Sequence, residues 1–230
     1  RQYLFPIASV IWLLNPRTEL EERSAPGETA SLRVAWRECG STLRHVLMFT
    51  GLMCVVGFFH PGLGPLIAAR ELGNAPMDLA AFTSVLALGS IAGGLLLQRN
   101  SHRFCQRPTL TLAGFALVTA VAQLGMAVGG DVPFLLAMTL LIGAGTAGLL
   151  SSSNLMTQVG STQILRGRMA GLGQIAFLGG GGLSGLIAAQ LTVSFGLQAT
   201  FAISGTLGIV LALLEIWRRG GSVLTEVRSV

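Results

Sequence analysis

Charge is scarce in this sequence. Only 11% of its 230 residues are Asp, Glu, Lys or Arg, and lysine is absent altogether. Soluble domains carry about 25% charged residues. Hydrophobic residues make up 51% of the chain, and a soluble fold of this length could not bury so much apolar surface, whereas a bilayer removes the need to. The composition therefore excludes an ordinary soluble domain and predicts an integral membrane protein.

Cysteines are few in the sequence, and acidic residues are almost absent from its apolar runs. The cysteines are odd in number and show no C-x-x-C spacing, so we expect no disulfide framework, metal site or cofactor: Cys39, Cys54 and Cys105. Glu215 is the only acidic residue inside an apolar run, and we expect it to form an interfacial ion pair with Arg218 and Arg219, three to four residues on. Because no His, Asp and Glu side chains gather at one depth, an enzyme is not expected.

Six apolar runs are long enough to cross a bilayer as helices. They cover residues 45–69, 79–97, 109–128, 134–156, 169–193 and 199–217. Backbone groups in lipid must be satisfied within each segment, so the predicted fold class is all-α, a polytopic membrane helix bundle. The arginines lie between these runs and form no stripe with interleaved aromatics, so nucleic acid is not an expected partner.

The first 44 residues are predicted to lead into this bundle. Residues 3–14 form an apolar run too short to cross the membrane, and Asn15-Pro16 ends it, so we interpret 1–14 as the tail of a further span whose beginning is missing. Residues 15–44 are predicted to be a cytoplasmic loop. From residue 29 to 43 the loop is weakly amphipathic, which predicts a short helix with Trp36 at headgroup level, the alternative being a solvated linker.

The arginines predict the orientation. The connections 15–44, 98–108, 157–168 and the tail 218–230 hold almost all of them, whereas 70–78, 129–133 and 194–198 hold only Arg70. By the positive-inside rule the first set is cytoplasmic, and the C-terminus with it.

Glycine and proline mark two places where the spans are expected to be irregular. His60-Pro61-Gly62-Leu63-Gly64-Pro65 predicts a break in the first run, since two prolines in six residues interrupt regular hydrogen bonding. Four successive glycines, Gly179, Gly180, Gly181 and Gly182, predict either a hinge or a closely packed surface in the fifth. Pairs four residues apart favour close helix crossings: Gly89 with Gly93, Gly125 with Gly129, and Gly181 with Gly185.

Candidate contacts for a substrate or proton follow from polarity within the runs. His60 lies at the predicted break and is the side chain there that titrates near neutrality, although freed carbonyls at the break could simply satisfy it. Thr146, Asn154 and Gln174 are neutral polar residues inside or at the ends of spans, where they serve either as ligand contacts or as interhelical hydrogen-bond partners.

Two segments resemble the C-terminal half of a major facilitator superfamily transporter. The segment 94–103 is similar to the family's cytoplasmic loop motif, keeping Gly94, Arg99 and Arg103 and departing from it at Gln98, Ser101 and His102. Asn154 with Gln158, Arg166-Gly167-Arg168 and the glycine run at 177–185 resemble, in the same order, the branch that includes the enterobactin exporter and the transmembrane secretion effector proteins.

The resemblance implies half of a twelve-helix fold, with 45–217 as the C-terminal six-helix bundle and an N-terminal half-bundle as partner. It implies proton-coupled export of a small organic molecule across the bacterial inner membrane, in which two bundles rock about a shared site. Arg99, Arg103, Arg166 and Arg168 would hold cytoplasmic helix ends together. The alternatives are a seven-helix receptor and a non-transporting membrane scaffold or permease-like subunit.

Overall fold

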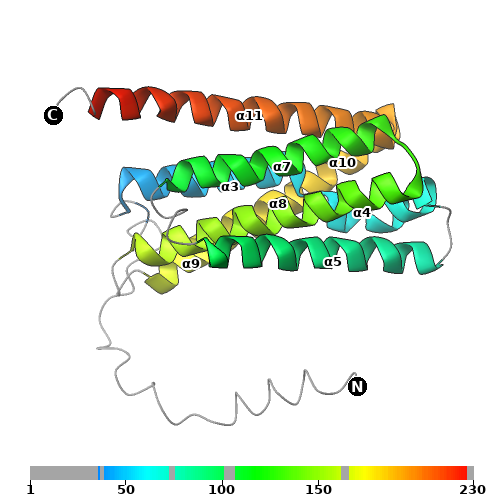
Figure 1. Cartoon of the computed structure of the whole chain (residues 1–230), viewed down its shortest axis with the longest axis horizontal. Helices are drawn as coiled ribbons and strands as arrows, with labels where there is room; N and C mark the ends of the chain where they lie inside the picture. Colours follow the sequence, from blue (N-terminus) through cyan, green and yellow to red (C-terminus); the bar gives the residue numbers. More distant parts are fainter. Residues whose placement is uncertain (1–35, 37–38, 73–75, 101–106, 162–165, 227–230) are drawn as a thin grey trace, which may run out of the picture.

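A computed structural model describes residues 36, 39–72, 76–100, 107–161 and 166–226, and every regular element in these ranges is a helix (Figure 1). The elements, two of them short π-helices labelled η, are α3 (Ser41–Gly57), α4 (His60–Ile67), η1 (Ala68–Leu72), α5 (Pro76–Arg99), α7 (Pro108–Val128), α8 (Val132–Val159), α9 (Arg166–Gln174), η2 (Ile175–Gly179), α10 (Gly180–Phe195) and α11 (Leu197–Glu226).

Six helical stretches are long and apolar enough to cross a membrane, which confirms the predicted spans in number and order. They are Ser41–Arg70, Met77–Arg99, Thr109–Val128, Val132–Val159, Arg166–Phe195 and Leu197–Arg218. The first joins α3, α4 and most of η1, and the fifth joins α9, η2 and α10. The helix of the sixth continues to Glu226, beyond the predicted end at Trp217, and no proline follows to end it. The chain is therefore a multi-pass membrane protein by the length and composition of its helices.

The spans pack in a definite pattern. α11 lies along α7, α7 along α8, and α8 along α5, which makes a row of four helices (Figure 1). α3 and α10 pack against one another and against α11, and α3 also touches α7 and α8. Two apolar clusters fill the interior, one around Leu112, Phe115 and Ala212 and the other around Phe59, Met126 and Phe201.

Glycines bring α5 and α8 into backbone contact. A Cβ atom on Gly89 would lie 2.0 Å from the Leu140 carbonyl oxygen, and one on Gly93 would lie 2.1 Å from that of Ala144. The crossing predicted from Gly89 and Gly93 is therefore confirmed. The other two pairs behave differently: Gly129 has φ +73° in the turn after α7, and the space beside Gly185 is open.

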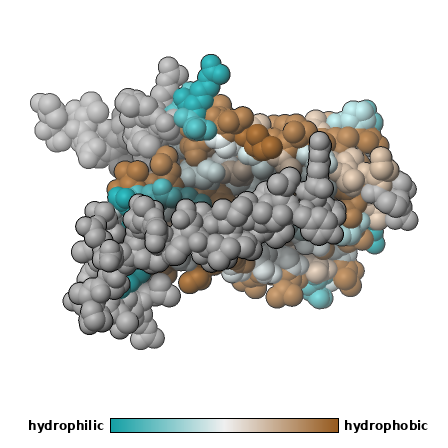
Figure 2. Space-filling view, turned by 90° about the horizontal axis from the view of Figure 1, so that it is seen from below, coloured by the Kyte–Doolittle hydropathy of each residue, from teal (hydrophilic) through white to brown (hydrophobic). Residues whose placement is uncertain are grey.

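Charge separates the two ends of the bundle. Consecutive spans alternate in direction, so Arg44, Arg99, Arg107, Arg166 and Arg218 share one end, and Arg70, Asp78 and Asp131 share the other. Between the ends, large hydrophobic side chains face outward, as the brown areas of Figure 2 show. The structure gives the grouping of the arginines, while the side of the membrane they face stays a prediction.

The predicted tail of a further span at 1–14 and most of the loop at 15–44 lie outside the described residues, as do 227–230. Trp36 is described. It is helical and partly buried, and it packs on a small cluster formed by Cys39, Leu43, Leu47 and Met169.

Candidate functional site

The first span is broken near its middle, a few residues before the predicted position. α3 ends at Gly57, Phe58 and Phe59 are not helical, and α4 begins at His60. The segment from His60 to Pro65, predicted to be the break, is itself helical. Pro61 lies in the first turn of α4, where a backbone N–H has no partner within the helix, so its ring costs nothing there.

Side chains from two other spans satisfy the carbonyls that the break leaves free. Gln123 on α7 donates from Nε2 to the Gly57 carbonyl at 2.7 Å, and Ser204 on α11 donates to that of Val56. Both side chains are buried, and the Ser204 hydroxyl also lies 3.4 Å from Oε1 of Gln123. These hydrogen bonds stabilise the break, because unsatisfied carbonyls at this depth would be costly.

The fifth span is also irregular, in the part that lies beside the break in the first span. Its winding widens to a π-helix in η2, which ends at Gly179, and returns to an α-helix at Gly180, the second residue of the four-glycine run. A Cβ on Gly180 would lie 2.9 Å from the Cys54 Cβ, and one on Gly181 would lie 2.6 Å from the Phe58 ring. The glycines therefore let α10 approach α3 closely beside the break.

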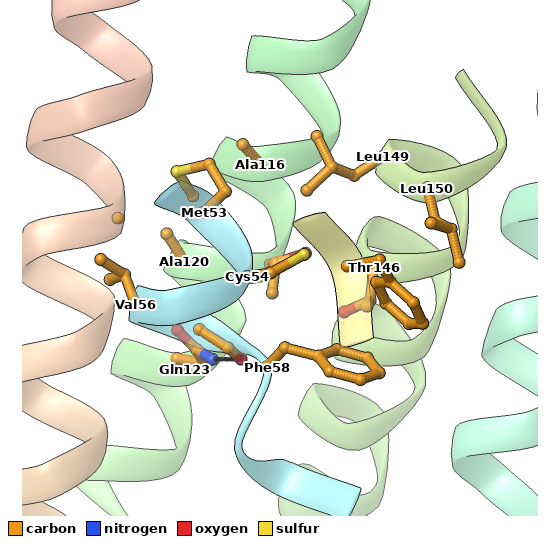
Figure 3. Close-up of a pocket in the computed structure, with 14 residues that line it drawn as sticks. Met53, Cys54, Val56, Phe58, Ala116, Ala120, Gln123, Thr146, Leu149 and Leu150 are labelled. Atoms are coloured by element: carbon orange, nitrogen blue, oxygen red, sulfur yellow. Dashed lines mark hydrogen bonds between the residues drawn. The ribbon is translucent and has the colours of Figure 1, made fainter. Parts of the chain in front are cut away.

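The two irregular segments meet through aromatic rings. The ring centroids of Phe58 and Phe177 are 4.5 Å apart. They border a small central cavity of about 20 Å³, lined mainly by apolar side chains of α3, α7 and α8. Figure 3 shows Gln123 reaching the α3 backbone, with Thr146 across from it on α8. The cavity has room for about one water molecule, so any larger ligand requires the helices to move.

The sequence candidates do not form one site. Thr146 lines the central cavity, with its hydroxyl donating to the Ile142 carbonyl of its own helix at 2.7 Å. His60 is buried beside the Phe58 ring, at a centroid distance of 5.2 Å, and borders a separate cavity of about 540 Å³ between α4 and α5. Asn154 lies where α8 meets α9, near Gly173, and Gln174 is exposed.

The residues predicted to hold the cytoplasmic helix ends lie at the arginine-rich end. Arg99 is exposed at the end of α5, and Arg166 and Arg168 lie in the first turn of α9. The space beside Gly94 is open. Arg103 lies outside the described residues.

Glu215 has a partner that the sequence did not predict. Its carboxylate is 5% exposed, and Oε1 lies 2.8 Å from Nε2 of His45 on α3, 170 residues away. The expected pairing with Arg218 and Arg219 stays a prediction, because the side chain of Arg219 lies outside the described residues. The carboxylate therefore joins the last span to the first.

No family model, curated protein or solved structure matches the chain. The site must accordingly be interpreted from its own geometry. Within the described ranges, no three His, Cys, Asp or Glu side chains are grouped so that they could hold a metal ion.

Sequence analysis missed three features of this region. The break at Phe58 had a local signal, because proline is common in the first turn of a helix and Pro61 therefore indicates a helix start just before it. The hydrogen bond from Gln123 to the Gly57 carbonyl had a partial signal, because a neutral polar side chain within a span commonly serves as an interhelical hydrogen-bond partner. The contact of Phe58 with Phe177 had none, since it joins two distant segments.

Proposed function

We propose that this chain forms a six-helix bundle of a secondary transporter that moves a small apolar or amphipathic molecule by alternating access. The observation that carries the proposal is the meeting of two irregular membrane helices at Phe58 and Phe177 beside a central cavity. Irregular backbone at membrane depth is tolerated where it is buried in protein or lines a cavity, and transporters place substrate sites at such segments.

Three of the span pairings support the proposal, because together they have the form of an inverted repeat. The first span pairs with the fifth, the second with the fourth, and the third with the sixth. Exchanging spans one to three with spans four to six, in order, interchanges the first–fifth and second–fourth pairings and leaves the third–sixth pairing unchanged. The exchanged spans run in opposite directions, as in the inverted repeats from which transporter bundles are built.

The least covered spans suggest where a second bundle would sit. In their most apolar stretches, the second and fifth spans are 17% and 22% buried, against 39–50% for the other four. The repeat exchanges these two spans with each other. Their faces also hold glycines with open space beside them, including Gly94, Gly182 and Gly185. We propose that another six-helix bundle covers them, from further sequence or a second chain.

Direction and energy source belong to the proposal as well. The resemblance to major facilitator exporters favours proton-driven export across a bacterial inner membrane, with the arginine-rich end and the C-terminus in the cytoplasm. The mainly apolar lining of the central cavity favours an uncharged or amphipathic organic substrate over an ion.

A reversible cross-link tests whether the junction moves. A Cβ on Gly51 of α3 would lie 3.5 Å from the Ala176 Cβ of η2, within the range of about 3.5–4.5 Å that a disulfide needs. The double variant Gly51→Cys with Ala176→Cys, made after the natural cysteines are changed to serine, is expressed with any second bundle the protein uses. Efflux of a panel of lipophilic dyes and ferric siderophores is measured before and after oxidation.

Oxidation is expected to abolish efflux, and a reductant to restore it. The matched control is Thr192→Cys with Thr200→Cys, whose native hydroxyls are 3.0 Å apart and which joins α10 to α11 away from the junction. This second link should leave efflux unchanged. If efflux by the protein with α3 cross-linked to η2 is as fast as efflux by the same protein before oxidation, the junction is not the moving part.

A further inference from the structure

A separate cavity of about 130 Å³ lies between α3, α10 and α11, beside the break in the first span. Val56 and Phe59 line it from the break, Ala188 from α10 and Leu207 from α11. Apolar side chains form most of its wall. Pockets of this kind, mainly apolar with a few polar groups, are typical of sites for small organic molecules.

One buried hydroxyl in the wall of this cavity is unused. Ser184 of α10 lines the cavity and is 1% exposed, and its Oγ has no hydrogen-bond partner among the described residues. Other buried hydroxyls of the spans donate to the carbonyl four residues earlier, as Thr139 does at 2.9 Å and Ser152 at 2.6 Å. Because a buried polar group without a partner is costly, the Ser184 hydroxyl is a contact point for a bound molecule.

The two other hydroxyls in the wall already use their protons. Thr200 donates to the Gly196 carbonyl at 2.9 Å, and Ser204 donates to the Val56 carbonyl. A water molecule held in a cavity needs two to four polar partners, and Ser184 alone supplies too few. An apolar molecule with one polar group fits the cavity better than water does.

We propose that this cavity binds a phenol or alcohol of about the size of benzene, with the hydroxyl of the ligand paired to Ser184. Apolar cavities of about 150 Å³ take up benzene, so the volume suits one ring. A hydroxyl both donates and accepts, so the pair can form in either direction. The binding does not require the proposed transport function.

The exposure of the wall gives the ligand a route from the membrane. Ile187, Ile203 and Leu207 line the cavity and are also 43%, 38% and 49% exposed on the outside of the bundle. The first of these side chains belongs to α10 and the other two to α11. A molecule dissolved in the hydrocarbon layer can therefore enter sideways between these two helices.

The test measures binding of 4-fluorophenol and fluorobenzene to the purified full chain in lipid nanodiscs by fluorine-19 NMR. Empty nanodiscs give the partition into lipid. The wild-type protein should bind 4-fluorophenol saturably, and unlabelled phenol should displace it. Ser184→Ala should weaken 4-fluorophenol binding by about 2- to 10-fold, the effect of one hydrogen bond, and leave fluorobenzene binding unchanged. Ser152→Ala removes a buried hydroxyl of α8 outside this cavity and should bind both probes as the wild type does.

Two further measurements locate the site. Ala188→Leu places a larger side chain in the cavity and should abolish binding of both probes. Ser184→Ala loses no hydrogen bond within the protein, so it should unfold in dodecyl sulfate at the same detergent fraction as the parent or a higher one.

Three results would each refute the site. The first is wild-type binding no greater than the partition into empty nanodiscs. The second is equal affinity for 4-fluorophenol in Ser184→Ala and the wild type, which would mean that Ser184 is not the contact. The third is easier unfolding of Ser184→Ala, which would mean that the hydroxyl already has a partner within the protein.

Discussion

Replacing Gly93 with alanine should destabilise the bundle, whereas the same change at Gly94 should not. A Cβ at position 93 would lie 2.1 Å from the Ala144 carbonyl oxygen and 2.8 Å from the carbonyl carbon. Both atoms belong to the backbone, so α5 and α8 must separate by about 1 Å or more to reach ordinary contact distance. Gly89 and Gly143 sit at the same crossing, with equally close backbone neighbours, so the separation loosens all three contacts.

The magnitude follows from two opposing effects. Forcing extra methyl groups into a packed interface costs about 1–3 kcal/mol. Alanine gains about 1 kcal/mol over glycine in helix propensity. Gly94→Ala has only the favourable effect on helix propensity, because the space beside Gly94 is open. We therefore expect Gly93→Ala to be less stable than Gly94→Ala by about 1–3 kcal/mol.

The measurement is unfolding in mixed micelles with increasing dodecyl sulfate, followed by the far-UV circular dichroism and by accessibility of the buried Cys54 thiol. Gly93→Ala should unfold at a lower detergent fraction than the parent, and Gly94→Ala at an equal or higher one. Identical midpoints for the two variants would refute the backbone contact between α5 and α8.

Three further predictions concern the junction and the topology. Gly180→Leu should displace α10 from α3 and slow transport, whereas Gly182→Leu, with open space beside it, should have little effect on the same efflux assay. Gln123→Leu should leave the buried Gly57 carbonyl without its donor and cost about 1–3 kcal/mol in micelle unfolding, while a leucine at the exposed Gln190 should not. A cysteine replacing Asp131 should react with an impermeant maleimide added outside intact cells, and protection there would reverse the predicted orientation.

The helices could be predicted from the sequence because a membrane span is encoded locally. Length and hydropathy alone decide whether a run can cross the bilayer, and the third span was predicted with the same bounds, 109–128, that the structure gives. The crossing at Gly89 and Gly93 was predictable for the same reason, since small-residue spacing acts through one helix face.

The site was less predictable because its contacts join distant segments. Pro61 was expected to interrupt its helix, but a proline in the first turn is tolerated, so the break falls at Phe58 and Phe59 instead. Glu215 was expected to pair with arginines on its own helix; its burial and its contact with His45 could not be predicted, because they depend on how the last span packs on the first. Helical spacing does not reveal which face of α11 is covered.

The attachments of α3 indicate which contact can move. Near its beginning, α3 is held to α11 by His45 and Glu215. At its end, the carbonyls of Val56 and Gly57 accept hydrogen bonds from Ser204 of α11 and Gln123 of α7. The contact of this helical span with η2 and α10 is formed instead by small residues, with Gly51 against Ala176 and Gly180 against Cys54, and by the rings of Phe58 and Phe177 at the end of α3.

Among the described residues, no side-chain hydrogen bond joins α3 to η2 or α10, so a shift of this contact breaks none, unlike a shift of α3 against α7 or α11. We therefore expect motion to occur between α3 and the fifth span, with α3, α7 and α11 moving as one body. The cross-link between positions 51 and 176 tests this movement, because it ties α3 to the fifth span at the contact that is expected to shift.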